Sequence, residues 1–278
     1  MAPKLWVLLA VLSACLALTA TASAAAAEIG PPAEMGSSGE IGPPDLAPTE
    51  FGAVAAQTTA TSASIAPSLS PDRRRAKATL TVAIDYSGGE SGLPSPVRKA
   101  ILGLPAGLSL NIPVLRSCNA EVLLEHGVSG CPAQALIGTG HATALFNLGS
   151  QPVVEQVQLW AFLGPLRNLQ PTFEILGEGF KPLGRAMVLT ATALPAHAPF
   201  GEELEMSIPP LATVPGQPDA SITNFSLTIG IGAHKRTRAS ATVVVPTHCP
   251  RGGLPFSAAF TYASGAQDNA LAKIPCPA

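Results

Sequence analysis

Residues 80–86 read Leu-Thr-Val-Ala-Ile-Asp-Tyr, and their side chains alternate between large apolar ones and smaller or polar ones. Successive side chains of an extended strand point to opposite faces, so Leu80, Val82, Ile84 and Tyr86 share one face. This period of two predicts a half-buried β-strand.

Further strands are predicted where apolar or alternating runs lie between turn residues, at 136–146, 154–162, 172–178, 186–193, 204–208, 222–229, 239–245, 256–262 and 270–274. The chain contains 28 Pro and 26 Gly, which interrupt long helices. The good helix candidate is 119–126, where Asn119 is placed to cap the helix and Gly127 to end it. We therefore predict an all-β fold, an antiparallel β-sandwich of roughly ten strands.

The N-terminus has the pattern of a signal peptide over residues 1–27. Lys4 precedes an uncharged apolar run from Leu5 to Leu18, and a small-residue tract with Ala-x-Ala sites follows. We expect cleavage, export and no membrane span in the mature chain.

Two alternatives to cleavage stay open at this point. A retained anchor is one, because about 20 uncharged residues can span a bilayer. The other is a lipoprotein anchored through Cys15, because Leu12-Ser13-Ala14-Cys15 resembles a lipobox. Against the lipobox, the apolar segment continues past Cys15 to Leu18.

Residues 28–75 differ in composition from the rest of the chain. Pro, Gly, Ser, Thr and Ala dominate, and the short motif at residues 28–32, Glu-Ile-Gly-Pro-Pro, recurs at 40–44. Such a composition cannot bury enough apolar surface to fold, so we predict a disordered linker. The β-domain would then span 76–278, with a candidate internal seam at 151–171, a segment rich in Pro.

Removal of the signal peptide would leave four cysteines, an even number in a chain bound for an oxidising compartment. Four cysteines allow three pairings. We favour the local pairs Cys118–Cys131 and Cys249–Cys276, because both loops are short. A zinc site is the rival, but the close spacing of structural zinc ligands is missing.

Several loop and cysteine motifs resemble a group of uncharacterised secreted actinobacterial all-β proteins. They are Leu104-Pro105-Ala106-Gly107-Leu108, Cys118, Gly130-Cys131-Pro132 with Ile137-Gly138-Thr139-Gly140, and the closing Cys249-Pro250 and Cys276-Pro277. The resemblance covers the part after the linker. It implies export and a β-fold, and no activity.

Charge and motifs argue against several functional classes. The chain has 16 basic and 18 acidic residues, without the basic excess of nucleic-acid-binding domains. A Gly-x-Ser-x-Gly nucleophile motif is missing, and the five histidines show no metal-ligand spacing. Trp160, the single Trp after the signal, lies in an apolar run typical of a core. We expect no cofactor.

Glu203 and Glu205 are the best enzyme candidates. Two residues apart on a strand, they would share a face about 7 Å apart, a carboxyl separation that inverting glycosidases use. Glu202 adjoins them, however, and three neighbouring acids are typical of a solvated edge. We therefore expect a non-catalytic extracellular or cell-envelope display or binding module, whose partner is an envelope polymer or protein. The alternative is a polysaccharide hydrolase that uses Glu203 and Glu205.

Overall fold

The computed structural model describes residues 59–71, 77–89, 92–111, 116–149, 151–213, 215, 217–230 and 242–276. The predicted signal peptide, Cys15 and most of the predicted linker lie outside the described residues. The described chain is all-β, as predicted, and its strands pair antiparallel. The strands are β1 (Thr59–Pro71), β2 (Lys77–Gly89), β3 (Val97–Pro105), β4 (Ser109–Asn111), β5 (Leu136–Leu148), β6 (Gln151–Leu163), β7 (Thr172–Gly179), β8 (Ala186–Pro195), β9 (Phe200–Ser207), β10 (Ser221–Ile229), β11 (Thr242–Val244), β12 (Leu254–Tyr262) and β13 (Gln267–Ile274).

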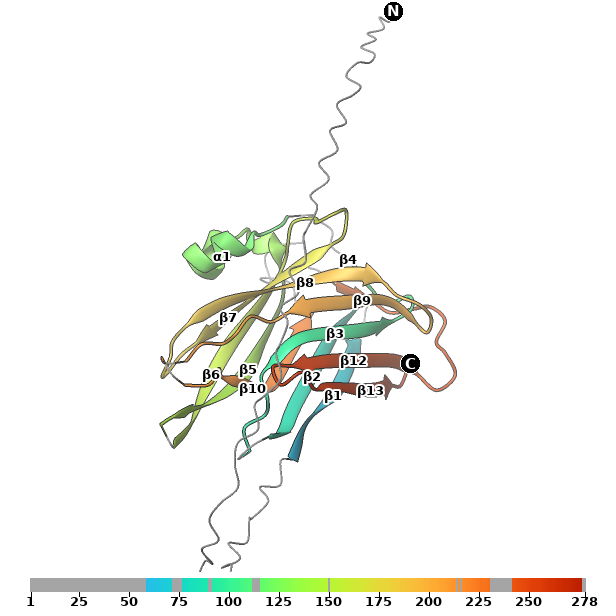
Figure 1. Cartoon of the computed structure of the whole chain (residues 1–278). Coiled ribbons are helices and arrows are strands. Elements are labelled where there is room, and N and C mark those ends of the chain that lie inside the picture. Colours follow the sequence, from blue (N-terminus) through green and yellow to red (C-terminus); the bar gives the residue numbers. More distant parts are fainter. Residues whose placement is uncertain are drawn as a thin grey trace, which may run out of the picture. The chain divides into compact units, whose positions relative to one another are not determined.

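All 13 strands belong to one sheet, whereas we predicted a sandwich of roughly ten. The order is β13-β12-β3-β9-β8-β7-β6-β5-β10-β2-β11-β4, with β1 paired to β2. The sheet folds over, so that β12 and β3 cross in front of β2 and β10 (Figure 1). The Tyr86 ring on β2 meets the Phe260 ring on β12 edge to face, with 5.2 Å between centroids. One core cluster therefore draws buried side chains from strands along the whole sheet.

Strand β1 corrects the predicted linker, which we extended to residue 75. Ala63, Ile65, Pro67 and Leu69 turn inward, while the residues between them are exposed. Ile65 lies opposite Ile84 on β2. The alternation is real but weak, because most of the side chains that carry it are Ala, Ser, Thr or Pro, which resemble linker composition.

Two further corrections concern the middle of the chain. The predicted seam at 151–171 is wrong along β6, which pairs with β5 on one side and β7 on the other. Strand β3 was not predicted, because residues 100–104, Ala-Ile-Leu-Gly-Leu, are apolar throughout and hide the period of two. In the structure β3 lies between β12 and β9.

A short helical segment covers part of the outer face of β6, β7 and β8. Helix α1 (Ala120–His126) lies where it was predicted, and Gly127 ends it at a φ of +61°, but the Asn119 side chain makes no capping hydrogen bond. The 3-10 turns η1 (Gly127–Gly130) and η2 (Ala133–Ala135) follow. Leu123 and Ala135 from this segment pack on outward-facing side chains of β6 and β7 in a cluster with Phe162, Leu176 and Cys118.

The structure contains both favoured disulfides. Cys118–Cys131 closes the helical segment, with 5.5 Å between Cα atoms. Cys249–Cys276 joins the chain before β12 to the end of β13, with 6.1 Å between Cα atoms. Disulfides of this kind suggest an oxidising, extracytoplasmic location.

No helix in the described part of the chain is long and apolar enough to cross a bilayer.

Candidate functional site

The interior between the two parts of the folded sheet contains two cavities. The narrow cavity has a volume of about 120 Å³ and lies toward β4, β11 and the start of β9. The wide cavity has about 240 Å³ and lies toward the segments 183–186 and 209–212. Ile175 and Phe225 line both, so they form the partition between them.

The wall of the narrow cavity is almost wholly apolar. Leucines from several strands line it, together with Phe173, Met206 and Val243. A cavity of about 150 Å³ with such a lining stays dry and binds benzene or xenon in another protein. The narrow cavity therefore suits apolar matter and offers water few partners.

Small residues occupy several inward positions on the walls of the wide cavity. Ala142 and Ala144 line it from β5, and Gly177 and Gly179 line it from β7. A close-packed core would place larger side chains here, since protein interiors normally have few voids larger than a water molecule. The sequence thus leaves space inside the sheet that its own side chains do not fill.

Glu155 is the exception to the apolar lining. It lies on β6 in the inward row with Val157 and Leu159, is 4% exposed, and lines the wide cavity. The Gly184 N–H donates to its Oε1 at 2.9 Å. Oε2 has no hydrogen-bond partner in the part of the chain that the structure describes.

The neighbouring backbone makes room for the Glu155 carboxylate. A side chain at Gly179 would start 2.1 Å from Oε1, which no atom pair tolerates. Gly184 has a φ of +59°, in the left-handed region that favours glycine, and this turn directs its N–H to the carboxylate. Arg185 follows in sequence, lines the same cavity and is exposed. The two glycines therefore fix one carboxylate inside the cavity, and Arg185 marks its rim.

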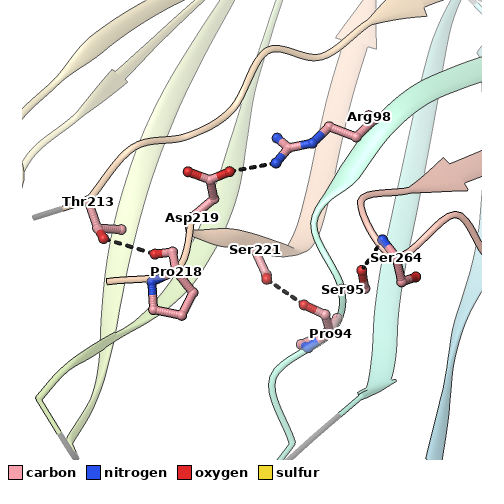
Figure 2. A network of polar contacts seen from close by, with 8 residues as sticks. All are labelled: Pro94, Ser95, Arg98, Thr213, Pro218, Asp219, Ser221 and Ser264. Atoms are coloured by element: carbon pink, nitrogen blue, oxygen red, sulfur yellow. Dashed lines mark hydrogen bonds and ion pairs between the residues drawn. The ribbon is translucent and has the colours of Figure 1, made fainter. Parts of the chain in front are cut away.

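A polar network holds the segment that covers the wide cavity. Residues 209–212 and Ala220 line the cavity, and polar contacts hold Thr213, Asp219 and Ser221 beside them (Figure 2). Arg98 on β3 donates to Asp219 at 2.5 Å. Thr213 Oγ1 donates to the Pro218 carbonyl at 2.9 Å, and the fully buried Ser221 hydroxyl donates to the Pro94 carbonyl. These contacts attach the covering segment and the start of β10 to β3 and to the loop before it.

Glu203 and Glu205 share the outer face of β9, as their spacing predicts, because the inward residues of this strand are Leu204 and Met206. Lys99 on β3 pairs with Glu205 at 3.0 Å. Glu205 also lines a shallow polar hollow of about 650 Å³ on the outer face, with Thr190, Thr192, Ser207 and Arg167. Glu203 is not part of that lining. The structure therefore places the two acids on one face without turning both into the hollow.

Glu174 lies beneath the same hollow and is fully buried. Its Oε2 accepts a hydrogen bond from Thr190 at 2.6 Å. Its Oε1 lies 3.7 Å from the Arg167 guanidinium, within ion-pair range but too far for a hydrogen bond, and has no hydrogen-bond partner among the described residues. Both neighbours are groups of this chain, so Glu174 has its partners within the fold.

Two tyrosines show how dry the interior is near the ends of the sheet. Burial raises the pKa of Tyr262 to about 12, and the negative charge of Asp268 adds to the shift. Burial raises the pKa of Tyr86 further, with a smaller contribution from Tyr262. The Tyr262 hydroxyl has no hydrogen-bond partner in the described chain.

The described residues do not form the metal site or the aromatic binding face that the sequence left as alternatives. All four cysteines of the zinc alternative form disulfides. Among the described residues, no three His, Cys, Asp or Glu side chains gather as metal ligands would. Trp160 packs at the edge of the outer cluster under the helical segment, as its apolar run predicts.

Sequence reasoning missed Glu155, although a signal was present. Residues 153–159 read Val-Val-Glu-Gln-Val-Gln-Leu, so a period of two places Glu155 on the face of Val153, Val157 and Leu159. A carboxylate on the apolar face of a strand is unusual and marks a position worth explaining. The cavity beside Glu155 could not be predicted from the sequence, because its volume depends on which strands face each other in the fold.

Comparison with known proteins adds no relative to this description: no protein-family model matches the chain, and neither does any curated protein or solved structure.

Proposed function

We propose that this protein is a non-catalytic binding module that holds an apolar small molecule inside its folded sheet. The observation that carries the proposal is the wide cavity itself, an unfilled part of the interior whose lining is mostly apolar. Binding sites for small molecules are concave and mostly apolar, with a few placed polar groups. The wide cavity has both properties.

Export supports a binding role outside the cytoplasm. The N-terminal signal pattern and the two disulfides agree with a secreted protein, and a lipid anchor at Cys15 is the alternative. In either setting, the protein could carry an apolar compound through water, a role that requires no catalytic residue. An envelope polymer or protein would then be the source or the receiver of the compound.

The test is binding of a hydrocarbon probe to the full chain with its disulfides oxidised. Diphenylhexatriene is uncharged, and its fluorescence rises when it leaves water for an apolar site. We expect saturable binding at about one probe per chain. The Ala142→Phe variant fills the wide cavity with a ring and should weaken binding at least tenfold.

Ala66→Phe is the matched control, because Ala66 is exposed on β1. It makes the same exchange away from the interior and should leave binding unchanged. Thermal melting of both variants shows that each is folded. If the unaltered chain leaves the probe dark, or if Ala142→Phe binds as well as the control, the proposal is wrong.

A second candidate, polysaccharide hydrolysis through Glu203 and Glu205, is favoured by the polar hollow beside Glu205. The Lys99 partner of Glu205 weighs against it, because a catalytic acid or base needs its carboxyl free for the substrate. Release of reducing ends from envelope glycans, lost in Glu205→Gln, would support this candidate. Glycan turnover that persists in Glu205→Gln would exclude that residue.

A further inference from the structure

Glu155 narrows the class of ligand, on the assumption that the proposed function holds. We propose that the compound in the wide cavity is an amphiphile with an apolar chain and a protonated amine, and that the amine pairs with the Glu155 carboxylate.

The placement of Glu155 makes the carboxylate part of the cavity wall. Its side chain is 4% exposed, so it meets the cavity and little of the outer solvent. Buried charges in proteins are paired or hydrogen-bonded, because an unpaired one is costly to desolvate. The fold supplies one N–H, from Gly184, to Oε1. That leaves the acceptor capacity of Oε2 for a donor that enters the cavity.

A charged donor fits better than a neutral one. Any donor to a carboxylate makes a charge-assisted hydrogen bond, but only a cationic donor adds Coulomb attraction between opposite charges, which a low-dielectric site strengthens. An ammonium group has three donors, enough to meet Oε2 and a neighbouring carbonyl or water. The alkyl chain would then lie along Ala142, Ala144 and Leu159, which line the same cavity.

Arg185 makes the opposite ligand worth testing. Its positive charge at the rim would attract a carboxylate head, as in a fatty acid. Arg185 is exposed, however, so water and salt screen its field, whereas Glu155 acts from inside the protein. A fatty acid would also bring a second negative charge next to Glu155. The buried carboxylate therefore decides the preference.

The experiment compares four ten-carbon ligands that differ only in the head: decylamine, decanol, decanoate and decane. Displacement of diphenylhexatriene from the full chain gives their affinities at pH 7. We expect decylamine to bind at least tenfold tighter than decanol, and decanoate to bind weakest. In Glu155→Gln the advantage of decylamine over decanol should fall to about twofold or less.

The glutamine variant keeps the shape of the side chain and can still accept the Gly184 hydrogen bond, so it should fold. Glu121→Gln is its control, because Glu121 is exposed on α1, away from the cavity. It should leave all four affinities unchanged. Arg185→Gln should change the decylamine affinity less than twofold.

The outcomes separate this inference from the proposed function. If neither the probe nor any of the four ligands binds, the proposed function fails. If decane and decanol bind but decylamine has no advantage, or keeps it in Glu155→Gln, the amine assignment is wrong while the binding module stands. If decanoate binds tightest and Arg185→Gln removes its preference, the head group is an anion and the assignment is reversed.

Discussion

Strands β6 and β7 each bury one glutamate, and the two residues lie on opposite faces of the sheet. Glu174 points outward beneath the polar hollow, where Thr190 donates to one oxygen and Arg167 lies near the other. Glu155 points inward, where Gly184 donates to one oxygen and the side chain lines the wide cavity. A glutamate is thus paired with Thr190 and Arg167 on one face, whereas on the other it lines the cavity that we propose as a binding site. The two glutamates differ because Thr190 and Arg167 lie next to Glu174, whereas Glu155 lies next to the wide cavity.

The largest expected effect concerns the cover of the outer face. Replacing Cys118 and Cys131 together by Ala removes the disulfide that closes the helical segment over Phe162 and Leu176. We expect the free energy of unfolding, measured by urea denaturation, to fall by about 3 kcal/mol, the value for a disulfide that closes a loop with a sequence separation of 13. Probe binding by the folded variant should be unchanged. A parallel loss of probe binding would mean that the two faces are coupled.

A smaller effect separates the two faces by packing alone. Ala135 is fully buried in the outer cluster, whereas Ala144 lines the wide cavity. Ala135→Val should destabilise by about 1–3 kcal/mol through overpacking, and Ala144→Val should cost less than about 0.5 kcal/mol because its methyl groups enter empty space. Urea midpoints of the two variants give the comparison directly. Equal losses would show that the inner face is as tightly packed as the outer one.

The smallest effect tests whether the interior is dry toward the end of the sheet. The pKa of Tyr262 is raised to about 12 in the folded chain, against about 10 when unfolded, so its contribution is fully present below pH 10 and is lost as the pH rises toward 12. The slope is at most about 1.4 kcal/mol per pH unit. Tyr262→Phe should remove its share of the slope between pH 10 and 12, leaving the share of Tyr86, and should change stability at pH 7 by less than about 1 kcal/mol. An unchanged slope would place the Tyr262 hydroxyl in contact with water.

Much of this molecule could be predicted from local sequence. The alternation in β2 and in β5 to β10 predicts strands, and it also predicts that Glu203 and Glu205 share a face. The two short cysteine loops predict the pairs that the structure contains. Each of these inferences depends on residues close together in the chain.

The rest depends on contacts between distant residues. Strand β1 is made of Ala, Ser and Thr, whose weak pattern becomes a strand only beside β2. Nothing in the sequence of β3 says that β9 and β12 are its neighbours. The cavity is harder still, because Ala142 and Gly177 are unremarkable until the opposite walls of the sheet are known. Glu155 could be placed on the inner face from its alternation, but not beside an open space.

The meeting of the first and last described strands has a consequence for how the chain folds. The Ala63 N–H on β1 donates to Asp268 Oδ2 on β13 at 2.6 Å, across 205 residues. A sheet whose edges meet across such a separation has a high contact order, so we expect folding in the slow part of the range for single domains. Until β12 and β13 have been synthesised, β3 lacks one of its partners and its free edge is open to other chains. Export of the unfolded chain would suit such a fold. The edge of β3 would then form only outside the cytoplasm, where β12 is already present to pair with it.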